Sequence, residues 1–119
     1  MTTLRIFDLV QKRVLVSRDS ARTIQPQLVA ALADGLGELV LDLSDVDGLT
    51  PSFFDETLSI VEEGLSARPQ SRFRLTVKNP PTTLSNKFRA VGRVHGLTVE
   101  ESEGIGWIIE RERTEPNAK

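Results

Sequence analysis

The stretch LVLDLSDVDGLTPSFFDE, residues 39–56, decides the fold of this chain. Its first part, Leu39–Leu43, is almost continuously apolar, as expected for a central strand that helices cover on both faces. A turn over residues 45–48 follows, and a helix is predicted to open near Thr50, with Pro51 at or close to its first position, where a missing N–H is tolerated. Apolar residues then recur at helical spacing and give this helix one apolar face: Phe54, Leu58, Val61 and Leu65.

Strand and helix patterns alternate on both sides of this stretch. Before it, residues 4–9 and 14–16 are β-type runs that predict a hairpin or two adjacent strands. A helix over residues 20–34 follows, with Pro26 either in its first turn or at a kink. After the stretch, the patterns predict a strand at 72–77, a helix around Phe88 that ends near Gly96, and a strand at 97–101. Residues 105–110 fit a strand or one helical face, and a strand is favoured.

This alternation predicts an α/β fold with a mostly parallel sheet and crossover helices. The chain has 119 residues, of which 39% are hydrophobic, enough for one core. We therefore expect a single domain over residues 1–113, followed by a flexible polar tail at 114–119.

Composition and charge exclude several function classes. A net charge of −2 and a low aromatic content of 5% argue against a nucleic-acid partner. No segment approaches the roughly 18 apolar residues of a membrane span, so no membrane association is expected. The chain has no cysteine, which suits a reducing compartment, and a cytoplasmic location is expected.

The 39–56 stretch resembles the signature of STAS domains, the sulfate-transporter and anti-sigma-factor-antagonist family, and is closest to its bacterial STAS-like branch. In that family a hydrophobic strand ending in Asp-Leu-Ser precedes a short loop and a helix that starts at a serine-containing turn. Ser17-Arg18, Asn79-Pro80-Pro81 and Gly96-Leu97 support the resemblance. It implies a mixed sheet with helices mainly on one face, and regulated docking onto a partner such as a histidine-kinase-like ATPase or anti-sigma factor.

The functional serine of the anti-sigma-factor antagonists lies in an Asp-Ser-Ser-Gly-like turn. Alignment on the Asp-Leu-Ser strand places Thr50, Pro51, Ser52 and Phe53 opposite that turn, and only Ser52 matches a phosphoacceptor. The other positions depart from the family pattern, with threonine for aspartate, proline for the first serine and phenylalanine for glycine. The resemblance therefore implies Ser52 as the candidate phosphoacceptor.

Ser52 also has a purely structural interpretation, because Ser52 and Asp55 have the spacing of a capping box that would satisfy free N–H groups at the helix start. In the functional interpretation, a phosphate here would lie at the positive end of the helix and add a charge of about −2 beside Asp55 and Glu56. Such a charge would repel an acidic partner surface.

The expected partner-binding surface is the loop and the exposed side of the following helix. It comprises Asp47, Gly48, Thr50, Ser52, Phe53, Asp55, Glu56 and Glu63. The acidic members form either a docking face for a basic partner or an ordinary solvated helix face.

Two other polar residues are expected to be structural. Asp42, on an apolar strand, is expected to accept hydrogen bonds from the following loop. Arg18 is a candidate ion-pair partner for Asp42 or Asp55.

Enzymatic and ligand-binding alternatives remain weaker. Asp45 and Asp47 resemble the nucleophile loop of haloacid-dehalogenase-type phosphatases, which would use Mg²⁺. A nucleotide or other phosphate ligand at the helix start is the leading alternative to protein binding. A triad of Ser52, His95 and Asp42 is formally possible, but a histidine beside a helix end has ordinary capping roles. We expect no enzyme activity, no cofactor and no metal site.

Overall fold

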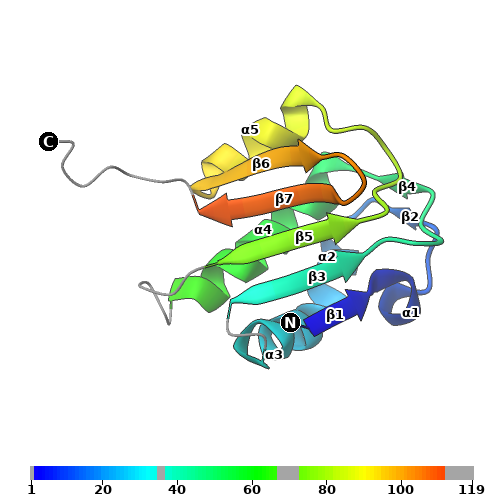
Figure 1. Cartoon of the computed structure of the whole chain (residues 1–119). Helices are drawn as coiled ribbons and strands as arrows, with labels where there is room; N and C mark the ends of the chain where they lie inside the picture. Colours follow the sequence, from blue (N-terminus) through cyan, green and yellow to red (C-terminus); the bar gives the residue numbers. More distant parts are fainter. Residues whose placement is uncertain (1, 35–36, 67–72, 112–119) are drawn as a thin grey trace, which may run out of the picture.

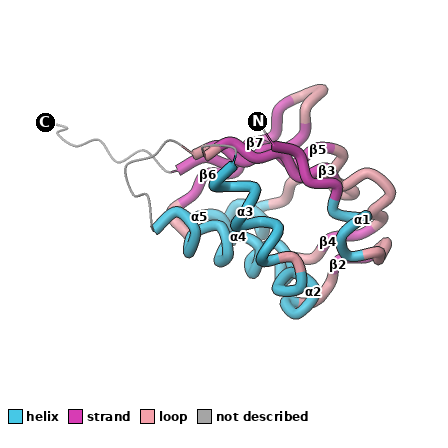
Figure 2. The backbone as a smooth tube through the Cα atoms, turned by 90° about the horizontal axis from the view of Figure 1, so that it is seen from below, coloured by secondary structure: helices cyan, strands magenta, loops and turns pink. Residues whose placement is uncertain are grey.

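The computed structural model describes residues 2–34, 37–66 and 73–111. A five-stranded sheet forms one layer, and the long helices pack on one of its faces (Figure 1). The view from below shows the same two layers, with the sheet on one side and α3, α4 and α5 on the other (Figure 2).

The elements follow one another along the chain in this order: β1 Thr2–Arg5, α1 Ile6–Val10, β2 Val14–Leu15, α2 Arg18–Thr23, α3 Gln25–Asp34, β3 Glu38–Asp42, β4 Gly48–Leu49, α4 Pro51–Ser66, β5 Arg74–Lys78, α5 Asn86–Val94, β6 Leu97–Ser102 and β7 Gly106–Arg111.

The main sheet is mixed and mostly parallel. Its strand order is β1-β3-β5-β7-β6, and a separate two-stranded sheet pairs β2 with β4. β1, β3 and β5 are parallel, β7 is antiparallel to β5, and β6 is antiparallel to β7. Four of the five strands therefore run in the same direction. This confirms the predicted α/β class, the mostly parallel mixed sheet and the placement of helices on one face.

The core lies between this sheet and the helices. Leu39 and Leu41 of β3 belong to it, whereas Val40, which is 6% exposed, lies outside that cluster on the opposite face. There the register places Val40 between Thr3 of β1 and Thr76 of β5. The prediction that helices cover β3 on both faces is therefore wrong. Neighbouring strands bury Val40, and β5 is the central strand.

The N-terminal prediction also needs correction. The run at residues 4–9 is not one strand, because β1 ends at Arg5 and α1 begins at Ile6, whose buried side chain packs into the core. β2 pairs in parallel with β4 and not with β1, so no N-terminal hairpin forms. The pairing partner of β2 lies more than 30 residues away, and local pattern gives no signal for it.

The predicted helix over residues 20–34 is two helices. α2 begins at Arg18, and the Ser17 hydroxyl caps it by accepting from Ser20 N at 3.1 Å. The break falls at Ile24, because Pro26 lies in the first turn of α3 and cannot donate to the Arg22 carbonyl.

The C-terminal half agrees closely with the sequence patterns. β5, α5 and β6 fall at the expected positions, and residues 106–111 form the strand β7, as favoured. The predicted tail at 114–119, and Arg72 at the start of the predicted strand, lie outside the described residues. In the described part of the chain, no helix has the length and apolar character needed to cross a bilayer.

Candidate functional site

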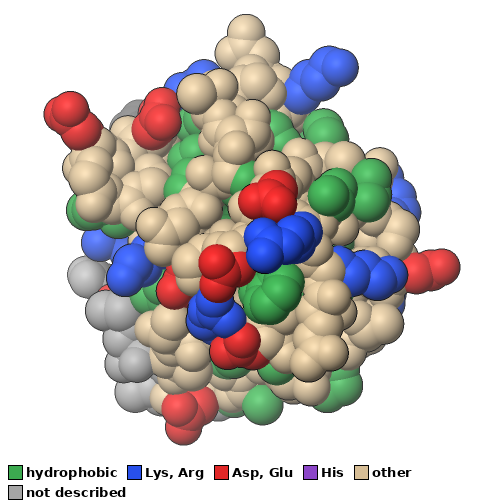
Figure 3. Space-filling model, turned by 90° about the vertical axis from the view of Figure 1, so that its right-hand side faces the viewer, with side chains coloured by type: hydrophobic (Ala, Val, Ile, Leu, Met, Phe, Trp, Pro, Cys, Tyr) green, Lys and Arg blue, Asp and Glu red, His purple; other side chains and the backbone are tan. Residues whose placement is uncertain are grey.

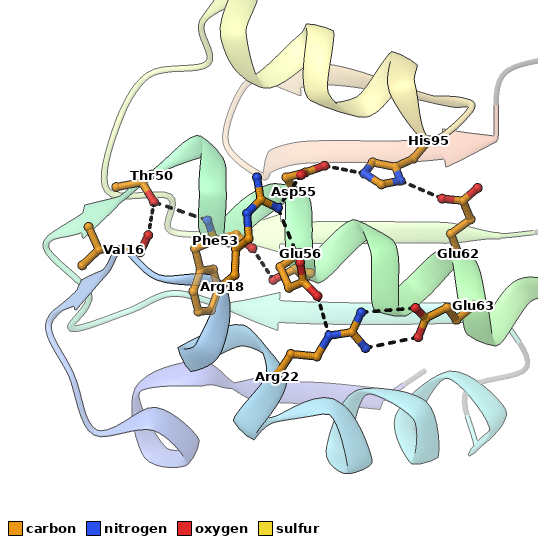
Figure 4. Close-up of polar contacts among 11 residues, drawn as sticks. Val16, Arg18, Arg22, Thr50, Phe53, Asp55, Glu56, Glu62, Glu63 and His95 are labelled. Carbon is orange, nitrogen blue, oxygen red and sulfur yellow. Dashed lines mark hydrogen bonds and ion pairs between the residues drawn. The ribbon is translucent and has the colours of Figure 1, made fainter.

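The start of α4 is anchored by Thr50. Its backbone N–H donates to the Leu15 carbonyl at 3.0 Å, and its hydroxyl donates to the Val16 carbonyl at 2.8 Å. The same hydroxyl accepts from Phe53 N at 3.3 Å, which makes Thr50 the N-terminal cap (Figure 4). The predicted capping pair of Ser52 and Asp55 is therefore wrong, since the cap lies two residues earlier and Pro51 is the first helical residue.

This cap leaves the Ser52 side chain exposed in the first turn of α4. Phe53 is only 4% exposed, and its side chain belongs to the core. The prediction that Phe53 contacts a partner is therefore wrong. Asp47 is exposed and Gly48 and Thr50 are partly exposed, in keeping with their expected place on the surface.

Two exposed valines lie beside this helix start. Val14 is 48% exposed and Val16 is 52% exposed, on either side of the buried Leu15. Val14 lies over Gly48, where its Cγ1 is 3.2 Å from the position that a Cβ of residue 48 would occupy. We call the surface formed by Val14, Val16, Asp47, Gly48 and Ser52 the β2–α4 surface. Sequence reasoning missed the valines because an exposed strand looks like a buried one when only its apolar character is read.

The acidic side of α4 is paired within the chain. Arg18 Nη1 bonds Asp55 at 2.5 Å and Glu56 at 3.4 Å. Arg22 bonds Glu56 through Nε and bonds both carboxylate oxygens of Glu63 at 3.2 Å. Hydrogen bonding to Arg22 holds the pKa of Glu63 below its usual value. The expected acidic docking face is thus an internal ion-pair network with α2 (Figure 4).

His95, the only histidine, joins the end of α5 to the same helix. Its Nε2 lies 2.6 Å from Asp55 and its Nδ1 lies 2.6 Å from Glu62, and its side chain is 9% exposed. Burial lowers the pKa of His95, but the hydrogen bonds to Glu62 and Asp55 outweigh burial, so the pKa is raised above its ordinary value. Burial likewise raises the pKa of Asp55, and the bonds from His95 and Arg18 outweigh it and lower that pKa.

The possible triad of Ser52, His95 and Asp42 does not form. Both His95 nitrogens face Asp55 and Glu62, and Asp42 is occupied elsewhere, where it accepts from Ser44 N at 3.0 Å and Asn79 Nδ2 at 2.9 Å. Burial raises the pKa of Asp42, and the hydrogen bonds from Asn79 and Ser44 outweigh burial and lower it. The prediction that Asp42 accepts from the following loop is confirmed. Of the two partners predicted for Arg18, the structure shows Asp55.

Asp45 and Asp47 do not converge on a common point. Asp45 pairs with Arg5, and Asp47 lies 3.5 Å from Arg13. Figure 3 shows one face of the molecule, on which acidic and basic side chains lie side by side around exposed hydrophobic ones. Among the residues that the structure describes, no group of three or more histidine or acidic side chains is placed to hold a metal ion. The pair therefore lacks the arrangement that a Mg²⁺-dependent phosphatase needs.

Comparison with family models, with curated proteins and with solved structures finds no match for this chain.

Proposed function

We propose that this chain is a non-catalytic, cytoplasmic regulatory module of the STAS-like type. It binds a protein partner through the β2–α4 surface, and phosphorylation of Ser52 switches that binding. The observation that carries the proposal is the accessible Ser52 side chain, which is not needed for capping and lies in the first turn of a helix whose cap, Thr50, bonds the carbonyl of the exposed Val16.

The partner we propose is a histidine-kinase-like ATPase or an anti-sigma factor. The resemblance of residues 39–56 supports this class, and the mixed sheet with helices on one face agrees with it. The exposed side chains of Val14 and Val16 also support the proposal, because burying them against a partner would favour binding.

Phosphorylation would act on this surface by charge and desolvation. A phosphoserine adds a charge of about −2 that a partner would have to desolvate next to the valines. We therefore expect the phosphorylated form to bind its partner weakly and the unmodified form to bind it strongly.

The two alternatives from sequence have less support. A phosphate ligand at the start of α4 would compete with Thr50, whose hydroxyl already bonds Phe53 N. A phosphatase would need Asp45 and Asp47 free, and both are paired with arginines.

The test compares binding of a partner, isolated by affinity capture from the native cells, to variants at position 52. We expect Ser52→Ala to bind within about twofold of the parent and Ser52→Asp to bind at least about tenfold more weakly, the equivalent of about 1.4 kcal/mol. Ala30→Glu adds a charge at an exposed position of α3 and serves as the matched control with unchanged affinity. Equal affinities of Ser52→Asp and Ser52→Ala would overturn the proposal.

A further inference from the structure

We infer that a phosphate on Ser52 is bound by the guanidinium of Arg18. To bind it, Arg18 gives up its present bonds to Asp55 and Glu56. This inference rests on the proposed function, because it takes Ser52 as the phosphoacceptor. The phosphate would then be bound by a side chain of the same molecule, without a partner protein.

The position of Arg18 follows from its existing bonds. Ser52, Asp55 and Glu56 are spaced i, i+3 and i+4 on α4, so their side chains are neighbours on one helix face. Arg18 contacts both carboxylates from a single nitrogen, Nη1, at 2.5 Å and 3.4 Å. Its guanidinium therefore lies about one helical turn from Ser52. Figure 4 shows Arg18 reaching Asp55 and Glu56 on α4.

Arg18 also has hydrogen-bonding capacity to spare. Within the described part of the chain, its Nε and Nη2 have no bonded partner, and its side chain is 53% exposed. Arg22 differs, because its Nε, Nη1 and Nη2 are all bonded to Glu56 and Glu63 and its side chain is 37% exposed. Of these two arginines of α2, Arg18 is the one whose Nε and Nη2 are both without a bond among the described residues, so it presents two adjacent nitrogens to a new anion.

Moving Arg18 leaves neither carboxylate without a partner. Asp55 keeps its contact with His95 at 2.6 Å, and Glu56 keeps its bond from Arg22. Without a cation beside it, by contrast, the phosphate would face the like charges of Asp55 and Glu56. In this exchange Arg18 loses the two bonds that Nη1 makes with Asp55 and Glu56. It gains a bidentate pair of hydrogen bonds with the phosphate, a geometry that arginine favours.

The exchange also links the modification to the β2–α4 surface. Arg18 is the first residue of α2 and follows Val16 by two positions, and the Val16 carbonyl accepts the Thr50 hydroxyl that caps α4. A guanidinium drawn toward Ser52 would therefore lie at the edge of the surface that the partner is proposed to contact.

The experiment is a phosphorus NMR titration of the chain phosphorylated at Ser52, with no partner present. The second pKa of a free phosphoserine is about 6, and a bonded arginine lowers it. We expect this pKa to rise by about half a unit in Arg18→Gln and to stay unchanged in the matched control Arg22→Gln. We also expect the Arg18 Nε–H signal, but not that of Arg22, to shift when Ser52 is phosphorylated.

A phosphate pKa that is the same in the parent and in Arg18→Gln would overturn the inference, as would equal rises in both arginine variants. Circular dichroism of each variant establishes that it is folded, and the Nε–H signal of the parent gives a second answer without any substitution. These readouts need no partner, so their failure is distinct from a failure of Ser52 to control binding.

Discussion

The contact of His95 with two carboxylates predicts that the stability of the chain depends on pH. Asp55 and Glu62 each lie 2.6 Å from one of the two ring nitrogens. Only the imidazolium form has an N–H on both nitrogens, whereas the neutral ring has one. Deprotonation therefore removes one donor and turns the lone pair of that nitrogen toward a carboxylate.

The expected size of the effect follows from these two bonds. A hydrogen bond to a charged group contributes about 1.5–3 kcal/mol, and a neutral one about 0.5–1.5 kcal/mol. Loss of one charged bond and weakening of the other, partly offset by better solvation of the neutral ring, lowers the free energy of unfolding by about 1–2 kcal/mol.

The direction follows from the pKa shifts. The pKa of His95 is raised in the folded chain, so its contribution is fully present below the unfolded value of about 6.5 and is lost as pH rises through the folded value. The pKa of Asp55 is lowered, so its contribution is present above its unfolded value of about 4 and is lost as pH falls through the folded value. We expect the greatest stability between these two limits, at mildly acidic pH.

Urea unfolding at about pH 5.5 and about pH 9 measures this dependence, because an ordinary histidine titrates between these values. We expect the parent to lose about 1–2 kcal/mol at the higher pH, or about 3–8 °C in melting temperature, and His95→Gln to show little change. Arg22→Gln removes a cation that pairs with Glu56 and Glu63 of α4 but leaves Asp55 and Glu62, the partners of His95, in place, so this variant should retain the dependence. A parent stability that is equal at both pH values, or a dependence that persists in His95→Gln, would refute the argument.

Three further predictions concern folding stability, measured by chemical denaturation. Thr50→Val removes the cap of α4 and should cost about 1–2 kcal/mol, while Ser52→Ala should change stability by less than about 0.5 kcal/mol; the reverse order would restore Ser52 as the cap. Trp107→Phe should cost no more than about 1 kcal/mol, because the fully buried Trp107 Nε1 has no partner among the described residues and its removal offsets part of the lost packing; a cost above about 3 kcal/mol would contradict this. Gly106→Ala should cost at least about 2 kcal/mol, since residue 106 has a φ of 132° and an added Cβ would lie 2.0 Å from the Val77 carbonyl oxygen; a neutral substitution would show that the backbone shifts freely there.

The elements that the sequence predicted well are those with a local periodic signal. The apolar stripe from Phe54 to Leu65 predicted α4, and the alternation around Leu75 predicted β5. The N-terminal region was harder, because residues 4–9 are apolar without a clear period and because β2 pairs with β4, distant in sequence. Pro26 carried a correct local signal, because its missing N–H accounts for the break at Ile24, but the sequence alone left open whether Pro26 lies in a first turn or at a kink.

The sequence predicted the location of the candidate site but not most of the hydrogen bonds and ion pairs within it. The loop and helix start at residues 47–52 were expected on the surface. Arg18 was expected to pair with Asp42 or Asp55, and the structure shows Asp55. The cap was assigned to Ser52 because serine and threonine have similar preferences, and only the strand pairing of β2 and β4 brings Thr50 to the Val16 carbonyl. His95 lies 40 residues from Asp55, so no spacing in the sequence connects them.

The most direct test of the proposed docking uses a photo-crosslinking amino acid at one exposed valine at a time, in the native cells. Val16 lies on the β2–α4 surface and is 52% exposed, and Val29, on α3, is 42% exposed and provides the matched control. We predict one discrete crosslinked protein from position 16, none from position 29, and loss of the product when Ser52→Asp is added. The same product from both positions, or a product from position 16 that Ser52→Asp leaves undiminished, would contradict this prediction.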